Sequence, residues 1–505
     1  MIGGTAGDHL GGLAINAQGA STGTGQIDIA GIGGAAEYGV EGVTTIGNTA
    51  SAGVDFDGTT YTVDGALTVT ATSTGEAITF SGGGATTVLT KADATQFNTG
   101  VINLAASTPL TIRSDGGAIS INSIMGAAGE DNDVTINAND DYDGDNDGET
   151  IATETITIGA VGSGDEIGKL TLDAADGITL TGDITLANKA LADLDVNSKV
   201  FISGDVTIDT DNATHDGLVD FASTIDGVDG GADDDLVILA GDTAEGGILT
   251  LGGAIGSTQG LTTLNINATD GDISFTVPQV GDGAGGDAGV SGATAFGNSG
   301  SGDIIFSAGT ANAYKFGGSL TVTSNGGAGA FQFTGSDPTV TAGGAVAFNE
   351  GAGTDDTMVL ADLKDLTIDT SAANANVTLP NIDGTAGDGD DQTDFTVDAG
   401  SGTVDVQSID TDINDVIITG STITLNGDIT TAAGTGGGAD AASIDLNGAV
   451  VIAGGTRTLT SGNGTIDFSS TVNSEASQTR ALELASGSGA VAINGTVGAG
   501  TDGTL

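Results

Sequence analysis

The residues best suited to chemistry are carboxylates with the spacing of a calcium-binding loop. Asp143, Asp145 and Asp147 are followed by Glu149 and by Glu154, which stands at the twelfth position of the pattern. In such loops, carboxylates at positions one, three, five and twelve and the backbone carbonyl of position seven surround the cation. A strand-like segment follows instead of a helix, so the loop departs from the helix–loop–helix form. The sequence predicts a calcium site here, with a solvated acidic loop as the alternative.

A second acidic pattern precedes strand-like segments. Asp233 and Asp235 lie in one copy of it, and Asp355 and Asp356 lie in another. Residues Gly230–Ile238 also approximate the nonapeptide that binds calcium in tandem β-helical arrays, although the copies here are isolated. A further cluster comprises Asp388, Asp390, Asp391 and Asp394. The two copies are predicted calcium ligands, and the alternative is that they are acidic turns at the start of strands.

The charge balance limits the partners of the chain. Its 505 residues include 68 Asp and Glu but only 9 Lys and Arg, which gives a formal net charge of −59. Such a chain is repelled by nucleic-acid phosphates and by anionic membrane surfaces. Its own carboxylates repel one another, and that repulsion destabilises a compact state. Calcium bound between carboxylates would relieve the repulsion, as would the screening of a high-salt environment.

The residue types that catalysis needs are scarce. The chain has no Cys and no Trp, and its only histidines are His9 and His215. Without Cys, it cannot form a disulfide or a zinc–thiolate framework. Paired carboxylates can perform acid–base work, but the aromatic and basic groups of a polysaccharide-cleaving site are nearly absent. We predict that the protein is not an enzyme, and we assign no catalytic residue.

Short β-strands must position these carboxylates. Apolar and polar residues alternate in segments such as Leu67–Thr70, Leu170–Leu172 and Leu366–Ile368, a pattern typical of strands. The 89 glycines, together with Asn, Asp and Ser, interrupt these segments after a few residues. Helical spacing is best developed in Ala187–Lys199, which is short. The fold class is therefore predicted to be all-β.

The strand-like segments recur in pairs. Leu67–Val69 precedes Ile78–Phe80 and Leu320–Val322 precedes Phe331–Phe333, with the same offset between the two segments in both pairs. Internal repetition of this kind indicates a solenoid. We predict an elongated parallel β-helix with degenerate rungs of about 20–25 residues. The alternative is a string of immunoglobulin-like sandwiches, whose buried Trp and longer strands are missing here.

The array is predicted to be continuous over residues 1–505. Two segments interrupt its regular pattern: an acidic loop insertion at 127–154 and a Gly-rich loop at 281–302. No apolar stretch is long enough for a transmembrane helix, and no signal peptide is visible at Met1. Neither end shows the polar cap that solenoids use to stay soluble, so we expect both ends to be uncapped.

The C-terminal part contains a repeat that resembles a known class of surface proteins. The run Arg457–Val472 is followed by a similar run, Arg480–Gly498, in which Leu482 corresponds to Leu459. These runs resemble the repeats of large bacterial β-strand-repeat surface proteins, similar to filamentous-haemagglutinin-type adhesins and autotransporter passengers. The resemblance is sharpest from 362 to 505. It implies export, an elongated β-helix and a role at the cell surface, and it implies no catalytic residues.

These features together predict an extracellular structural or adhesive surface protein that assembles end to end into a fibre or layer. Its partners would be further copies of itself or neighbouring repeats of the same chain, and a cell-surface glycan or protein receptor. The alternative is a calcium-dependent adhesive segment of a much larger single-chain adhesin.

Overall fold

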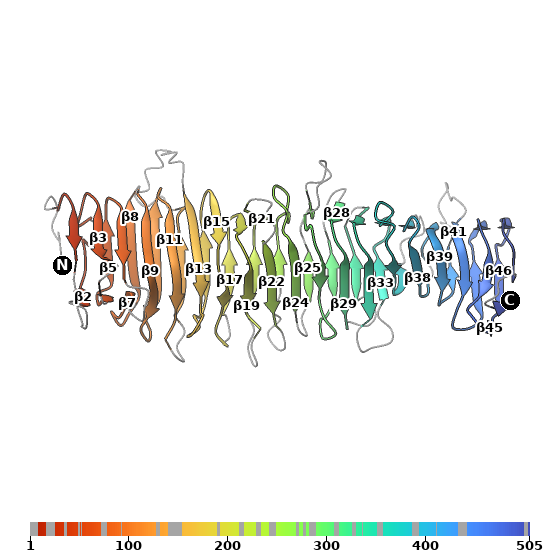
Figure 1. The fold of residues 1–505 in the computed structure, drawn as a ribbon, viewed down its shortest axis with the longest axis horizontal. Coiled ribbons are helices and arrows are strands. Elements are labelled where there is room, and N and C mark those ends of the chain that lie inside the picture. Colours follow the sequence, from red (N-terminus) through yellow and green to blue (C-terminus); the bar gives the residue numbers. More distant parts are fainter. Residues whose placement is uncertain are drawn as a thin grey trace. The chain divides into compact units, whose positions relative to one another are not determined.

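The computed structural model of the chain is shown in Figure 1. The residues that it describes are 9–16, 26–34, 38–48, 51, 53–71, 78–91, 93–127, 132–139, 154–188, 192–211, 217–228, 234–241, 249–268, 272–275, 279–281, 289–307, 313–325, 330–335, 337–350, 357–385, 393–410, 412–432, 442–498 and 503–504. They fall into two compact units, unit 1 (Met1–Leu249) and unit 2 (Thr250–Leu505).

Unit 1 contains strands of two sheets, one with a single strand per turn and one with two, which in some turns are joined into one long strand. The first sheet comprises β5 (Thr60–Val63), β8 (Thr86–Lys91), β10 (Leu110–Asp115), β12 (Val134–Asn137), β14 (Leu170–Asp173), β17 (Leu194–Val196) and β20 (Val219–Phe221). The second comprises β1 (Leu13–Ile15), β2 (Gln26–Ile29), β3 (Thr44–Gly47), β4 (Gly53–Phe56), β6 (Leu67–Thr70), β7 (Ile78–Phe80), β9 (Thr95–Leu104), β11 (Ile119–Met125), β13 (Thr155–Val161), β15 (Gly177–Leu180), β16 (Ile184–Thr185), β18 (Val200–Ile202), β19 (Val206–Asp209), β21 (Ile225–Gly227) and β22 (Asp235–Ala240). Strand β23 (Leu249–Leu251) spans the boundary between the units.

Unit 2 repeats this layout. The one-strand side comprises β25 (Ile273–Phe275), β27 (Ile304–Phe306), β30 (Phe331–Phe333), β33 (Thr357–Leu360) and β36 (Asn381–Gly384), with a separate sheet of β40 (Ile429–Thr430), β42 (Arg457–Thr460) and β46 (Leu482–Ala485). The two-strand side comprises β24 (Thr263–Ala268), β26 (Thr294–Phe296), β28 (Ala313–Phe316), β29 (Leu320–Ser324), β31 (Thr339–Ala342), β32 (Val346–Glu350), β34 (Leu366–Asp369), β35 (Val377–Thr378), β37 (Phe395–Asp398), β38 (Thr403–Val406), β39 (Val416–Leu425), β41 (Ala442–Ile452), β43 (Asn463–Phe468), β44 (Val472–Ser474) and β47 (Val491–Ile493). Strands β45 (Gln478–Thr479) and β48 (Gly503–Thr504) form a small additional sheet.

Each strand pairs in parallel with the equivalent strand of the next turn. In unit 1, β14, β15 and β16 form one turn and pair with β17, β18 and β19 of the next. The strand pairs recognised in the sequence are therefore consecutive strands of the chain: β6 and β7 lie on the two-strand side, whereas β29 and β30 lie on different sides. They pair with equivalent strands of neighbouring turns and not with each other. Each unit is a parallel β-solenoid, which confirms the predicted fold class. The sandwich alternative is wrong, because sandwich strands run antiparallel.

The length of a turn varies along the chain. Leu110 pairs with Thr86 of the preceding turn and with Val134 of the following one, at equal separations in the sequence. Val134 in turn pairs with Leu170, at a clearly larger separation, and this longer turn holds the acidic segment. However, β12 lies inside the predicted loop 127–154, because its Val134 and Ile136 alternate with outward residues and reach the core. Strand β26 lies inside the predicted Gly-rich loop 281–302, where Thr294 and Phe296 are the buried residues.

The structure corrects the alignment of the C-terminal repeat and shows what the segment with the best helical spacing forms. Comparison of the two C-terminal runs predicted that Leu459 corresponds to Leu482. This prediction was wrong, because Leu459 pairs with Leu484, the next residue of β46 on the same face. The segment Ala187–Lys199 contains β17 instead of a helix, because Leu194 and Val196 both face the core. The described residues contain no helix, and hence none with the length and hydrophobicity to cross a membrane.

The core of each unit is a stack of equivalent apolar side chains from successive turns. In unit 1, Leu110, Val134, Leu170 and Leu194 follow one another in register and are fully buried. In unit 2, the rings of Phe275, Phe306 and Phe333 stack in register, with centroids 5.2 and 4.8 Å apart and planes within 8° of parallel. In most strands, the inward residues are apolar and join such columns, and the alternating outward residues lie at the surface.

Candidate functional site

Most predicted calcium ligands lie outside the described residues. This applies to Asp143, Asp145, Asp147, Glu149, Asp233, Asp355 and Asp356. Glu154 and Asp235 are described. In the residues that the structure describes, no group of three or more His, Cys, Asp or Glu side chains is arranged to hold a metal ion. Calcium binding therefore stays a prediction.

Glu154 contacts the next turn of the solenoid. Its backbone N–H donates to Asp176 Oδ2 at 3.1 Å, and its backbone carbonyl accepts from the Asp176 N–H at 2.9 Å. Burial and the nearby Asp176 carboxylate raise the pKa of the Glu154 carboxyl above its ordinary value. A cation near these two carboxylates would therefore be bound favourably, because it would offset their mutual repulsion.

The carboxylate of Asp234 has a structural role that the sequence did not reveal. It is 5% exposed, and its two oxygens accept hydrogen bonds from the backbone N–H groups of Gly204 and Val228, each at 3.1 Å. Asp235, a predicted ligand, begins β22 and is half-buried. Asp233 and Asp235 are predicted ligands because of the acidic pattern and its similarity to the nonapeptide, but such a pattern does not show which carboxylate of the run turns inward.

The best-defined acidic feature is a row of four aspartates in unit 2. We call Asp337, Asp365, Asp394 and Asp415 the aspartate ladder. The Oδ1 atom of each of the first three accepts the backbone N–H of the next, at 3.2, 2.9 and 3.1 Å. The Oδ1 atom of the fourth accepts the N–H of Ser443 at 2.7 Å. One carboxylate per turn thus links consecutive turns where strands β34, β37, β39 and β41 begin.

The aspartate ladder brings like charges close together. Burial raises the pKa of Asp365 and Asp394, and the neighbouring carboxylates of Asp337 and Asp415 act in the same direction, whereas the accepted backbone hydrogen bonds oppose the shift. Adjacent strands lie about 4.7–4.9 Å apart, a distance at which partly desolvated like charges repel appreciably. The carboxyl groups of Asp365 and Asp394 therefore hold protons more readily than isolated surface carboxyl groups.

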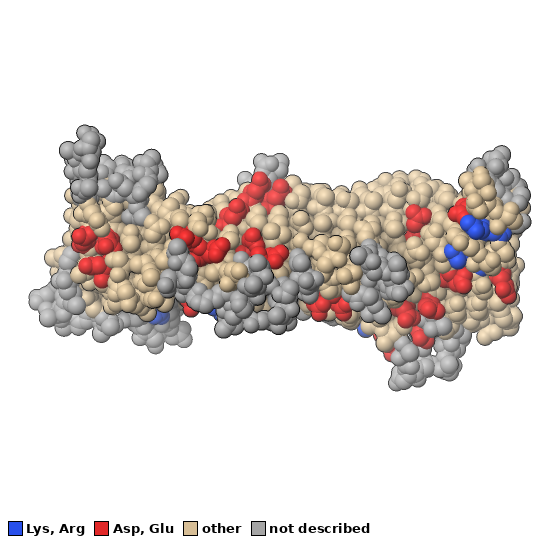
Figure 2. All heavy atoms as spheres, turned by 90° about the horizontal axis from the view of Figure 1, so that it is seen from below, with Lys and Arg blue, Asp and Glu red and all other residues tan. Residues whose placement is uncertain are grey.

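Other acidic side chains are stacked in the same way. Asp195 and Asp220 pair in register on β17 and β20, where burial and Asp195 raise the pKa of Asp220. Lys169 forms an ion pair with Asp195, which raises the pKa of the Lys169 ammonium group. Figure 2 shows acidic side chains of one face gathered in separate patches among uncharged residues, with few basic side chains. Because the chain has 68 Asp and Glu and only nine Lys and Arg, most of its carboxylates cannot each have a basic side chain of their own.

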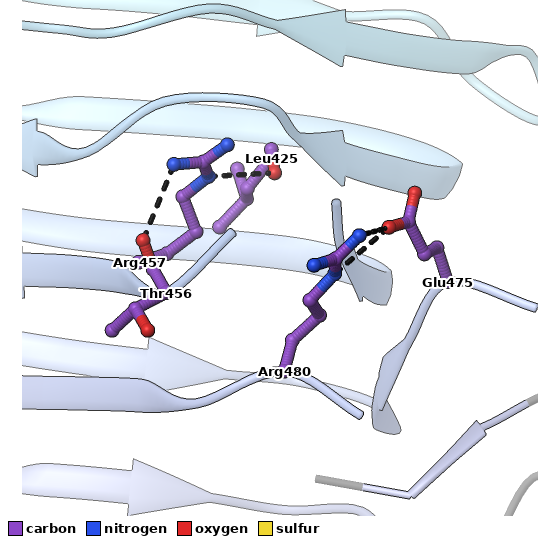
Figure 3. A network of polar contacts seen from close by, with 5 residues as sticks. All are labelled: Leu425, Thr456, Arg457, Glu475 and Arg480. Carbon is purple, nitrogen blue, oxygen red and sulfur yellow. Dashed lines mark hydrogen bonds and ion pairs between the residues drawn. The ribbon is translucent and has the colours of Figure 1, made fainter. Parts of the chain in front are cut away.

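Two arginines of unit 2 make polar contacts with neighbouring segments, as Figure 3 shows. Arg480 donates from Nε to Glu475 Oε1 at 2.8 Å and also contacts the same oxygen through Nη2, and this bond lowers the pKa of Glu475. Arg457 donates to the backbone carbonyls of Leu425 and Thr456, at 3.4 and 3.2 Å. Arg457 thus bonds to the preceding turn at Leu425, and Arg480 bonds to Glu475, the residue that follows β44.

We call β46, β47 and Val497 the C-terminal edge. Val491, Ile493 and Val497 are 43%, 37% and 51% exposed, although equivalent positions of earlier turns are buried. A pocket of about 630 Å³ lies beside them and is lined by apolar groups of Leu482 and Leu484. Among described residues, β46 pairs only with β42, and β47 only with β43. This edge therefore offers both apolar side chains and unpaired backbone groups.

Comparisons with known proteins give no match: no protein-family model, no curated protein and no solved structure resembles this chain.

Proposed function

We propose that the protein is a non-enzymatic, extracellular structural or adhesive component of a cell surface, and that it assembles through stacking of its rungs. The exposed apolar C-terminal edge is the observation that supports this proposal. Exposed strand edges are templates for pairing with another strand, and the added strand gains both backbone hydrogen bonds and apolar contact. The strand that covers this edge belongs either to a second copy or to further repeats of the same chain.

Assembly can be tested with a single charge at the C-terminal edge. We expect the wild-type chain to form oligomers that grow with protein concentration, and we expect Val491→Lys to reduce this growth strongly, because a buried unpaired ammonium group is costly. Sedimentation velocity and negative-stain microscopy measure the outcome. The matched control is Val228→Lys, since Val228 is also 43% exposed but lies in unit 1. Monomers at all concentrations, or equal loss of assembly in both variants, would contradict the proposal.

A second candidate is a calcium-dependent adhesive segment of a larger single-chain adhesin. The spacing of Asp143, Asp145 and Asp147 favours it. The mass of the intact native polypeptide separates the two candidates, because the present chain accounts for 48.5 kDa. A much larger mass would show that neighbouring repeats of the same polypeptide cover the C-terminal edge.

Calcium is expected to raise the melting temperature of the chain. The expected sites have affinities of about 10⁻⁴–10⁻³ M, so the measurement compares a few millimolar CaCl₂ with excess chelator at equal ionic strength. Asp145→Asn combined with Asp147→Asn should abolish most of the difference, whereas NaCl at matched ionic strength should not reproduce it. An unchanged melting temperature on chelation would remove calcium from the proposed function.

A further inference from the structure

Unit 1 has an open groove on the outer face of its two-strand side. Its volume is about 580 Å³, and β6, β9, β11 and β13 contribute to its lining. The polar side chains that line it include Thr70, Asn98, Ser120, Asn122, Thr157 and Thr181. The groove therefore crosses several turns of the solenoid, which lie about 4.7–4.9 Å apart.

An irregularity of β9 creates the groove. Ile121 of β11 pairs with Phe97, but Ser123 pairs with Val101, so β9 is longer than β11 over this interval. Thr99 lies in this bulge with φ of 59°, and its hydroxyl donates to the carbonyl of Ala71 at 2.7 Å. The bulge thus displaces the surface of β9 from that of its neighbours, as β-bulges do.

A glycine lies beside Asn122, one of the residues that line the groove. Gly159 of β13 lies opposite Asn122, and a Cβ atom at Gly159 would lie 2.0 Å from the Asn122 carbonyl oxygen. Only glycine fits this close approach of two backbones, and consequently no side chain fills the space above it.

The lining of the groove carries no charged side chain, although the chain has 68 carboxylates. Anionic ligands need Arg or Lys as partners, and calcium needs carboxylate oxygens. The groove provides hydroxyl and amide groups, each able to donate and accept hydrogen bonds. The side chains of Ser120, Asn122 and Thr157 make no hydrogen bond within the described part of the chain, so they are available to a ligand.

We infer that this groove binds a neutral oligosaccharide extended across the turns of unit 1. Hydroxyl-rich ligands match a lining of alternating donors and acceptors without charge. Phe97 is 1% exposed and cannot act as a stacking platform, so recognition rests on hydrogen bonds. This inference rests on the adhesive role proposed above and gives that role a class of ligand.

The test uses the full chain and three soluble hexasaccharides. Cellohexaose and the hexamer of N-acetylglucosamine are the neutral probes, and hexagalacturonate is the anionic comparison. Saturation-transfer NMR and calorimetric titration should detect a neutral probe in preference to hexagalacturonate. The double variant Asn122→Ala/Thr157→Val should weaken that binding roughly tenfold, because it removes two hydrogen-bonding side chains.

The matched control is Thr111→Val combined with Thr135→Val. These threonines are half-buried and outward-facing, as Thr157 is, but they pair with each other on β10 and β12, away from the groove. Their replacement should leave binding unchanged. The inference is overturned if neither neutral probe binds at millimolar concentration, if hexagalacturonate binds more tightly, or if both double variants bind like the wild type. The titration is repeated with Val491→Lys, which retains the groove but is expected to assemble less. Unchanged binding by this variant would show that oligosaccharide binding does not depend on assembly.

Discussion

Replacement of Phe306 by alanine is expected to destabilise unit 2 by about 3–5 kcal/mol, the usual cost of truncating a buried aromatic side chain. The Phe306 ring lies between those of Phe275 and Phe333, at centroid distances of 5.2 and 4.8 Å. Its edge also meets Tyr314 at 5.4 Å. Alanine would leave a cavity in the middle of this stack, and neighbouring turns are too constrained by their own strand pairing to close it.

Urea unfolding of the full chain measures this effect. Ile305→Ala provides the control, because Ile305 lies on the same strand but faces outward and is only half-buried. Its truncation should cost much less than that of Phe306. Phe306→Leu, which keeps an apolar side chain in the stack, should give an intermediate loss. Equal losses of unfolding free energy in Phe306→Ala and Ile305→Ala would show that the phenylalanine stack does not stabilise unit 2 more than an outward-facing residue does.

The fold could be predicted because the burial of a solenoid turn is periodic in the sequence. Segments such as Leu170–Leu172 alternate inward and outward residues, and this pattern survives variation in loop length. The register between turns is harder to predict. Leu459 pairs with Leu484 and not with Leu482. Both leucines fit the alternation, and only the three-dimensional pairing distinguishes them.

The acidic features were harder to predict than the fold. The links of the aspartate ladder join residues 21 to 29 positions apart, so no fixed spacing marks them. Each aspartate of the ladder does precede a strand, as Asp394 precedes β37, and this position next to a strand can be read from the sequence. The signal does not reveal that the carboxylate reaches the backbone of the next turn. The groove of unit 1 could not be predicted from the sequence, because the bulge at Thr99 contains no distinctive residue type.

Acidification from pH 7 to about 4.5 is expected to raise the melting temperature. Burial and neighbouring carboxylates raise the pKa values of Asp303, Asp365, Asp383, Asp394 and Asp445 above the ordinary value of 3.8. A carboxyl with a raised pKa binds its proton more tightly in the folded state. Its stabilising contribution is therefore complete below the unfolded pKa and is lost as the pH rises through the folded one. The decline of the net charge from −59 on acidification acts in the same direction.

The variant Asp394→Asn isolates the contribution of the aspartate ladder. Asparagine keeps an oxygen that can accept the Asp415 N–H, just as Asn374 and Asn376 accept the N–H groups of Ser401 and Thr403 at 2.9 and 3.0 Å. It removes the charge while leaving the link between turns. We therefore expect Asp394→Asn to melt at a higher temperature than the wild type at pH 7 and to depend less on pH.

Glu483→Gln is the matched control for this experiment, because it makes the same carboxylate-to-amide change at an exposed position of β46. It should change the melting temperature little at either pH. High NaCl at pH 7 should narrow the gap between the wild type and Asp394→Asn, since salt screens the repulsion that the substitution removes. A wild-type melting temperature that falls steadily between pH 7 and 4.5 would show that the hydrogen bonds accepted by the ionised carboxylates outweigh their burial and repulsion. In that case Asp394→Asn should be destabilising, so the sign of its effect at pH 7 decides which of the two forces dominates the ladder.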